Sequence, residues 1–453
     1  MPLPSSSAAP KSGKSALTRQ DLNSWFAAGC KPEKDWRIGT EHEIFVFDLA
    51  TKNPAPYSGD ASICAIFREM ATFGWQPAYE NGNAIAMTRA GASLSLEPGG
   101  QLELSGAPLK TLHETEQELS SHFKELRHVG EKLGLGFLPV GVHPTWNLAQ
   151  MPHMPKARFD AMGNYLQNIG TRSREIMYLT CTVQTNLDFS SEEDMATKMC
   201  VSMALQPLAI ALWANSPFLE GERTDYQSMR SHFWTQTDTK RTGFLPEVMN
   251  KDFCFDNYTD FALKAPMTMA VKDDEIISTP WQAFADFIGG SLPELPDQKA
   301  TLEDWENHLG TLLPEVRLKQ FIEMRGSVCG SPEMILAHPA FWTGLLYDST
   351  TLAQAHAWVK DWREGDITAL FEQARKHGLN GQGINGESIK TMAEKALKLS
   401  RQGLEARALG EEVYLAPLAG ILQSGKTPAE LLIDTTEAHP DKDPAVLFDA
   451  FKL

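Results

Sequence analysis

Five short segments of this chain carry acidic or amide side chains on one face and apolar side chains on the other. In the first, residues 38–47, Glu41 and Glu43 lie two positions apart and point to the same face of a predicted β-strand, about 7 Å from each other. Two like charges side by side on a sheet are costly unless a positive charge lies over them. A divalent cation would meet this need, because hard cations prefer carboxylate oxygens. The alternative is a solvated strand face.

The other four segments repeat the pattern of the first. They are residues 93–97, 101–105, 182–189 and 321–326. Together the five predict an α+β fold with a largely antiparallel sheet, helices packed behind it and a concave acidic face in front. Because several carboxylates on one face would repel one another, we predict that metal ions lie among them. The carboxylates concerned are those of Glu41, Glu43, Glu97, Glu103 and Glu323.

Charge and composition exclude some classes of protein. The net charge of −17 over 453 residues argues against a nucleic-acid partner, which needs a basic face. No apolar run approaches the roughly 20 residues of a membrane helix, so no membrane partner is expected. Residues 1–16 lack the apolar stretch of a secretory signal and predict a disordered tail. Six scattered cysteines without a CxxC motif favour free thiols in a reducing cytoplasmic location.

The chain is expected to contain one catalytic domain, residues 17–350, with a helical region packed on it, residues 351–453. Residues 192–214 are apolar all round and predict a core helix. Residues 215–242 show little periodicity and have the composition of a functional loop. Other apolar periodicities predict helices at residues 18–28, 61–72, 111–133, 350–362, 367–377, 386–407 and 428–432.

Two short motifs match nucleotide-binding patterns but are interpreted as turns. Residues 420–427, GILQSGKT, fit the phosphate-loop pattern, which requires a buried parallel strand before it. Here Thr427 and Pro428 instead form a helix start, with Pro at the first helical position. Residues 381–386, GQGING, lie between two predicted helices with no strand before them.

Longer segments identify a family. Between about residue 38 and residue 350, the sequence contains SLEPGGQLELSGAP, MPKARFDAM, TCTVQTNLDFSSE, SMRSHFWTQTD, PEVRLKQ and IEMRG. These strongly resemble the plant-type glutamate–cysteine ligases of plants and some proteobacteria, carboxylate–amine ligases related to glutamine synthetase. The resemblance implies ATP-dependent joining of L-glutamate to L-cysteine through a γ-glutamyl phosphate, the first step of glutathione biosynthesis. The implied small-molecule partners are glutamate, cysteine and ATP, with Mg²⁺.

The resemblance also implies roles for individual residues. Activation of a carboxylate by ATP brings a triphosphate beside another anion, so the site needs Mg²⁺ to neutralise both. The implied catalytic residues are Glu323 and Arg325, the latter steadying the transferring phosphoryl group. The implied metal ligands are Glu41, Glu43, Glu97, Glu103 and Glu323, with Gln184. The implied substrate-binding residues are Arg158, Thr182, Asn186, Arg230, Trp234 and, more weakly, Arg241; the alternative for each arginine is a surface or structural role.

The sequence departs from the plant members in one respect, and other functions stay open. The stretches IISTPW, SLPELPD and MILAHP contain none of the regulatory cysteines of plant members, so we expect no plant-like disulfide switch and a monomer or weak homodimer. One alternative function is a γ-glutamyl ligase with another amine acceptor. A second is a metal-dependent amide hydrolase, which would need no nucleotide. A third, a non-catalytic binding protein, would tolerate loss of some carboxylates, yet all five are present.

Overall fold

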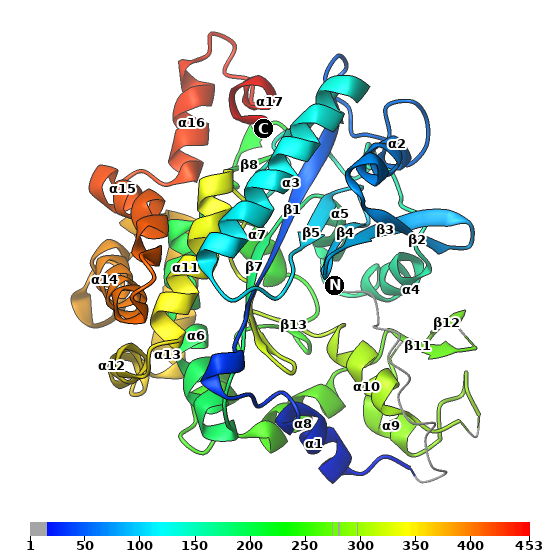
Figure 1. The fold of residues 1–453 in the computed structure, drawn as a ribbon, viewed down its shortest axis with the longest axis vertical. Coiled ribbons are helices and arrows are strands. Elements are labelled where there is room, and N and C mark those ends of the chain that lie inside the picture. The colour runs from blue at the N-terminus through cyan, green and yellow to red at the C-terminus, as the bar shows by residue number, and fades with distance from the viewer. Residues whose placement is uncertain (1–15, 274, 280, 297) are drawn as a thin grey trace.

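An antiparallel sheet of nine strands crosses the molecule (Figure 1). The structure is a computed structural model and describes residues 16–273, 275–279, 281–296 and 298–453, so the predicted tail lies almost entirely outside it. The strand order is β14-β15-β7-β1-β5-β4-β3-β2, with β6 beside β1. In that order the bounds are Val316–Leu318, Ile322–Met324, Val183–Leu187, Ile38–Asp48, Leu102–Ser105, Ala92–Leu96, Asn83–Arg89 and Gln76–Glu80, with β6 at Leu135–Leu138. The predicted α+β fold with a largely antiparallel sheet is confirmed.

Strand β1 is the axis of this sheet, and its two halves have different partners. Residues 38–44 lie between β5 and β7, whereas residues 45–48 pair with β6. All five predicted strand segments belong to this sheet. The hairpin of β2 and β3 was not predicted, although Asn81 and Gly82, both with positive φ, form its turn.

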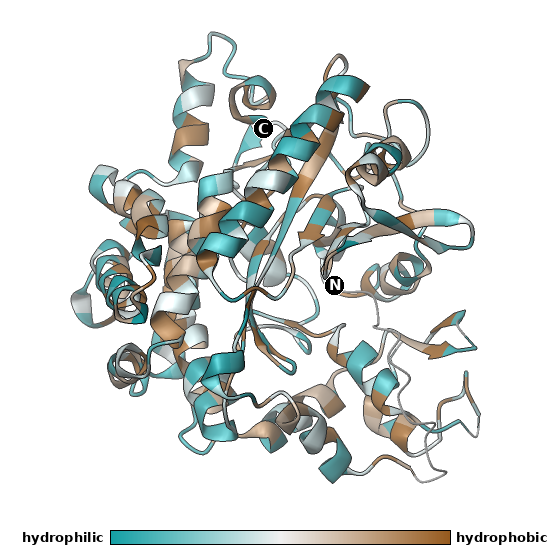
Figure 2. Cartoon of the chain, in the orientation of Figure 1, coloured by the Kyte–Doolittle hydropathy of each residue, from teal (hydrophilic) through white to brown (hydrophobic). Residues whose placement is uncertain are grey.

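Helices cover the back of the sheet. They are α3 (Leu112–Leu133), α6 (Glu192–Leu212) and α11 (Pro332–Leu346), which pack against β1, β6, β7, β14 and β15. Figure 2 shows a mainly hydrophilic outer side on α3, as expected of a helix with one face on a core. Among the described helices, α6 is long and apolar enough to cross a membrane, but 89% of its apolar window is buried inside the fold. It is therefore the predicted core helix, although the expectation that no apolar run approaches the length of a membrane helix is wrong for this segment.

Four C-terminal helices form an outer layer on α6 and α11. These are α12 (Ser349–Val359), α13 (Glu364–His377), α14 (Ile389–Arg407) and α15 (Ala416–Ser424). Of the last two helices, α16 (Pro428–Ala438) packs against α17 (Val446–Phe451), and α17 packs against β6. They share one hydrophobic core with the sheet. Neither nucleotide-binding motif follows a strand, but the interpretation of both as turns is only partly right, because residues 420–424 are the last residues of α15 and residues 384–386 form a short 3-10 helix. Gly425, with φ of 70°, ends α15 just before α16 begins, and residues 381–386 lie between α13 and α14.

The front of the sheet faces a smaller layer. Helices α4 (Ala157–Leu166), α5 (Ser173–Tyr178) and α7 (Met229–Trp234) build a second hydrophobic cluster there. The predicted loop 215–242 therefore contains a helix, α7, of only six residues, which is too short to show a periodic pattern. The remaining elements surround this layer or the rim of the sheet: α1 (Arg19–Ala27), α2 (Ile63–Met70), β8 (Phe218–Leu219), β9 (Glu222–Arg223), β10 (Thr242–Gly243), α8 (Phe255–Lys264), β11 (Met269–Lys272), β12 (Glu275–Ser278), α9 (Phe284–Ile288), α10 (Leu302–Leu309) and β13 (Leu313–Pro314).

One buried carboxylate ties the C-terminal layer to α3. Glu411 is fully buried; its Oε1 accepts a hydrogen bond from the Leu112 N–H at the start of α3 (2.7 Å), and its Oε2 pairs with Arg407 (2.9 Å). Glu411→Ala should lower the free energy of unfolding by roughly 2–4 kcal/mol, because it leaves a helix N–H and a guanidinium without their acceptor. Chemical denaturation measures this loss. The neighbouring Glu412→Ala is the matched control, and an equal loss in both variants would contradict the assignment.

Candidate active site

The acidic face of the sheet forms the floor of a pocket, and α4, α5 and α7 form its walls. The antiparallel register of the strands places polar side chains of neighbouring strands directly opposite one another. Glu43 lies directly opposite Glu103 on β5, and Glu41 lies opposite Gln184 on β7. Ser95 on β4 donates a hydrogen bond to Glu103 (3.0 Å). Four of the predicted carboxylates therefore line one pocket: Glu41, Glu43, Glu97 and Glu103.

A tight turn after β4 fixes the position of Glu97. Gly100, with φ of 83°, makes the turn, and the Glu97 N–H donates to the Gln101 carbonyl (2.9 Å). The Gln101 amide donates in turn to the carbonyls of Met177 (3.2 Å) and Thr180 (2.9 Å) at the end of α5. The turn is thereby attached to the front layer, so the sheet and the wall of the pocket are positioned together.

The four carboxylates resist ionising together. Burial and then the charges of Glu97 and Glu103 raise the pKa of Glu43 well above its usual value. Burial and Glu103 raise the pKa of Glu97 to about 7, and burial and Glu323 raise the pKa of Glu41. Within the described part of the chain, no three His, Cys, Asp or Glu side chains are close enough to form a ready-made metal cage. The excess negative charge nevertheless suits a hard cation.

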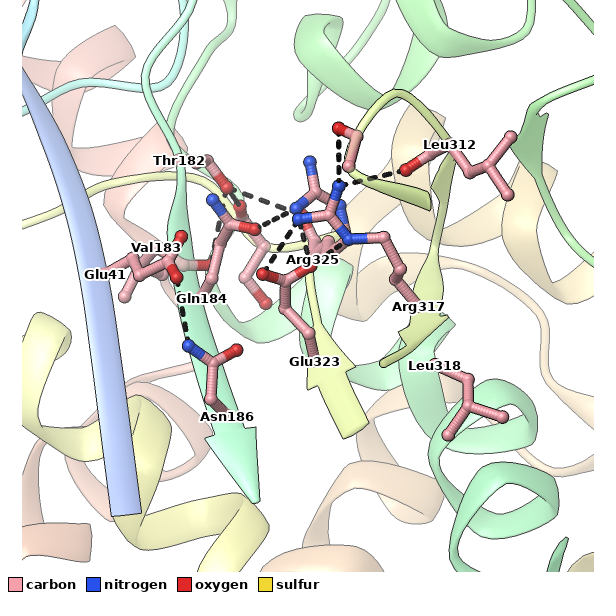
Figure 3. Close-up of polar contacts among 12 residues, drawn as sticks. Glu41, Thr182, Val183, Gln184, Asn186, Leu312, Arg317, Leu318, Glu323 and Arg325 are labelled. Atoms are coloured by element: carbon pink, nitrogen blue, oxygen red, sulfur yellow. Dashed lines mark hydrogen bonds and ion pairs between the residues drawn. The ribbon is translucent and has the colours of Figure 1, made fainter. Parts of the chain in front are cut away.

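Glu323 differs from the other four carboxylates because two arginines hold it (Figure 3). Arg317 binds it through Nε (2.6 Å) and Nη2 (3.0 Å), and Arg325 binds it through Nη1 (2.7 Å). Burial alone would raise the pKa of Glu323, but the two guanidinium groups outweigh it and hold that pKa far below its usual value. Arg325 also donates to Gln184 Oε1. Arg317 and Arg325 line the pocket, whereas Glu323 lies behind them and outside the described lining.

Five of the six predicted substrate-binding residues line the pocket: Arg158, Thr182, Arg230, Trp234 and Arg241. Arg158 donates to the Gly310 carbonyl (3.1 Å), and burial lowers the pKa of Arg230 to about 10. The Thr182 hydroxyl donates to the Ser327 carbonyl (2.9 Å) and its N–H donates to Glu43 (3.1 Å). Asn186 instead donates to Glu41 (3.0 Å) and orients that carboxylate from outside the described lining.

Arg241 is mainly engaged by the protein itself. It is 1% exposed, and its Nε donates to Asp238 (2.7 Å). Its Nη1 donates to Thr311 (3.1 Å), its Nη2 donates to the Pro266 carbonyl, and the guanidinium lies over the Tyr165 ring. This set of partners favours the structural alternative over a substrate clamp.

Sequence reasoning missed two cations of the pocket, Lys156 and Arg317. Both lie in segments that carry the family resemblance, MPKAR and VRLKQ. Arg317 alternates with Val316 and Leu318 on β14, a period-two signal that was readable. Lys156 stands immediately before α4; burial lowers its pKa, while Glu97 acts in the opposite direction. Only the packing of α4 over the sheet brings this lysine to the carboxylates.

Because the pKa of Glu97 is raised, the free energy of unfolding of the protein without ligands or metal should depend on pH. A carboxyl whose folded pKa is about 7, against an ordinary 4.5, contributes stability below pH 4.5 that is lost as the pH rises through 7. Glu97→Gln should therefore unfold like the wild type at pH 4.5 and be more stable at pH 8, by roughly 1–3 kcal/mol. Denaturant titrations at the two pH values measure this. The exposed Glu131→Gln should change neither, and a less stable Glu97→Gln at pH 8 would contradict the prediction.

Comparisons with known proteins identify the family. The profile of the glutamate-cysteine ligase family 2 (GCS2) matches residues 37–447. Chloroplastic glutamate–cysteine ligase B of Oryza sativa subsp. japonica is 44% identical over 421 residues, 93% of this chain and 84% of that protein. The chloroplastic enzyme of Medicago truncatula is 42% identical over 433 residues, 96% of this chain and 85% of that protein. A crystal structure of Francisella tularensis glutamate–cysteine ligase in complex with AMP has a similar fold, with a TM-score of 0.53, 13% identity, and coverage of 92% of this chain and 87% of that one.

The comparisons also correct one expectation. The predicted cytoplasmic location is wrong, because these close relatives are chloroplastic proteins. The prediction rested on free cysteines, which indicate a reducing compartment and do not single out the cytoplasm. The family profile matches nearly the whole chain, and plant members of the family are 42–44% identical to it. The chain therefore belongs to the glutamate–cysteine ligase family 2 and is a ligase.

Proposed function

We propose that the pocket over the acidic face performs the reaction of the family, the ATP-dependent joining of the γ-carboxylate of L-glutamate to the amino group of L-cysteine. The product is γ-glutamylcysteine, in the first step of glutathione synthesis. One observation carries the proposal: four carboxylates face arginine and lysine side chains across a single pocket. The carboxylates could coordinate the cations that accompany a triphosphate, and the arginines could form bidentate hydrogen bonds with the carboxylates of amino acids.

The carboxylate set fits magnesium in its chemistry. Glu41, Glu43, Glu97 and Glu103 offer oxygen donors. Burial, and then repulsion by neighbouring carboxylates, raises the pKa of three of them, and cations would offset both effects. Magnesium bound there would neutralise and orient the phosphates of ATP. Glu323 has both oxygens on arginines and Gln184 has its oxygen on Arg325, so each would bind a metal only by sharing or exchanging those partners.

The cationic residues of the chain then divide the remaining work. The γ-carboxylate of glutamate attacks the γ-phosphorus of ATP, ADP leaves, and the amine of cysteine displaces phosphate from the resulting acyl phosphate. Arg325, held by Glu323, is placed to stabilise the charge on the transferring phosphoryl group. Arg230 and Arg158 would bind α-carboxylates, and the Trp234 ring, close to Arg230, would limit the access of water.

The amine acceptor is the part of the proposal most open to test. A γ-glutamyl ligase with another acceptor would use the same carboxylates and arginines. The experiment is phosphate release from ATP with glutamate and a panel of amines, with the products identified by mass spectrometry. Cysteine should give the highest kcat/KM. A different amine that surpasses cysteine would assign the alternative function, and phosphate release without any amine would contradict a ligase.

The carboxylates should be essential for turnover. Glu41→Gln and Glu103→Gln should keep the fold and reduce kcat by orders of magnitude, with a higher requirement for Mg²⁺, because each leaves the nucleotide charge less neutralised. Steady-state rates across a Mg²⁺ series measure both effects, with the exposed Glu131→Gln as the matched control. Wild-type rates in either variant at millimolar Mg²⁺ would contradict the metal assignment.

Arg230 should affect one amino acid. Arg230→Lys keeps the charge but loses the planar fork, so apparent affinity for that amino acid should fall by roughly 1.5–3 kcal/mol. The KM of one amino acid should rise and that of ATP should stay unchanged. Arg174→Lys, at an exposed position on α5, is the control. An equal rise in the KM of all three substrates would indicate a folding role instead.

A further inference from the structure

A small side cavity opens from the main pocket between α7 and β13. It is lined by Arg230, Trp234, Leu313, Pro314, Glu315 and Arg325, of which all but Pro314 and Glu315 also line the main pocket. Its volume of about 10 Å³ is room for one group the size of a water molecule. An ammonium group has this size.

Glu315 is the acidic member of this lining. It is 6% exposed, and its backbone is fixed on both sides, with its N–H on the Gly243 carbonyl (2.9 Å) and its carbonyl accepting from the Arg325 N–H (3.0 Å). Nothing in the described chain donates a hydrogen bond to its carboxylate or forms an ion pair with it. Burial raises the pKa of Glu315, and Arg375, Arg230 and Arg325 oppose that rise through their charges. The carboxylate therefore has three arginine charges around it but no hydrogen-bond donor of its own, and the side cavity leaves room for one.

The neighbouring backbone leaves room for this carboxylate. A Cβ atom at Gly326 would lie 2.3 Å from Glu315 Oε2 and 2.6 Å from the amide nitrogen of Gln206 on α6. Gly326 does not have a positive φ, so glycine is needed there for space. The Gln206 amide is fully buried, and both its oxygen and its nitrogen are without partners among the described residues.

The guanidinium of Arg230, which also lines the side cavity, makes few hydrogen bonds of its own. Arg230 is 3% exposed and donates from Nη1 to the Arg325 carbonyl (3.3 Å), while its buried Nε–H has no acceptor in the described structure. The side cavity is therefore lined by a carboxylate without a hydrogen-bond donor and by a guanidinium that makes one long hydrogen bond. Such a pair is complementary to the ammonium and carboxylate of one amino acid.

We propose that the side cavity holds the α-ammonium group of the glutamate substrate, with Glu315 as its acceptor and Arg230 binding the adjacent α-carboxylate. This assignment rests on the proposed function. Two amines meet in that reaction: the amine of cysteine must be neutral to attack, whereas the amine of glutamate must stay protonated so that it does not compete. A carboxylate beside an ammonium favours its charged form. Glu315 is thus a specificity-determining residue for the amino acid that is activated.

The test compares L-glutamate with glutarate, which has the same two carboxylates and no amine. With ATP and cysteine, the wild type should prefer glutamate by at least about 100-fold in kcat/KM, because glutarate leaves Glu315 unpaired. In Glu315→Gln the preference should fall below about 10-fold. The rate with glutamate should drop while that with glutarate is unchanged or higher, and the KM values of ATP and cysteine should stay within about twofold of wild type. The exposed Glu247→Gln is the control.

A second variant reaches the same carboxylate without replacing it. Gly326→Ala places a methyl group against Glu315 and should reduce the preference for glutamate in the same way. Calorimetric titration with L-glutamate should show weaker binding in both variants. An equal loss for glutamate and glutarate, an unchanged preference, or a wild type that uses both equally well would overturn the assignment. Failure of the proposed function is a different result, a wild type that makes no γ-glutamylcysteine from glutamate, cysteine and ATP.

Discussion

The carboxylates on one face of the antiparallel sheet repel one another, and the rest of the fold has to offset this repulsion. Glu43 and Glu103 stand directly opposite each other on neighbouring strands, and Glu97 lies close enough to raise the pKa of Glu43. A fold relying on those groups alone would be destabilised near neutral pH. The chain offsets the repulsion in two ways. A core shared by the sheet, the back helices and the C-terminal layer supplies apolar burial, and basic residues at the far side of the pocket supply positive charge.

The two sides of the pocket are built differently. At the β14–β15 end, Arg317, Arg325 and Glu323 form a closed network in which every charge has a partner. At the β1–β5 end, the acids have few donors from the described chain, and a ligand cation would complete them. Between these ends lies the space in which a nucleotide and two amino acids would meet. The closed network holds its side chains in fixed positions, and the acidic end is where the proposed cations would bind.

Much of this arrangement was predictable from the sequence because strand periodicity is local. The faces of Glu41, Glu43 and Glu103 follow from alternation alone, since each lies inside a strand. Alternation also puts Arg325 on the same face as Glu323 and puts Arg317 on the face opposite Val316 and Leu318. The contact between Arg317 and Glu323 was not predictable, because β14 has only three residues and its pairing with β15 is a tertiary fact. The hairpin of β2 and β3 was missed although its Asn81-Gly82 turn is a strong local signal. Lys156 depends on the docking of α4, which periodicity does not report.

The double pairing of β1 has a consequence for how this family can vary. One half of the strand carries the acids between β5 and β7, and the other half buries Phe45 and Phe47 beside β6. Removing one residue between the halves would reverse the facing of one of them. Either the acids would turn to the helix-covered face of the sheet, or Phe45 and Phe47 would exchange faces with Ile44 and Val46, which are buried as well but smaller. In members of this family, insertions and deletions should therefore be absent from β1 and occur in connections such as residues 49–62. The number of residues in β1 therefore fixes both the position of the active-site acids and the packing of Phe45 and Phe47.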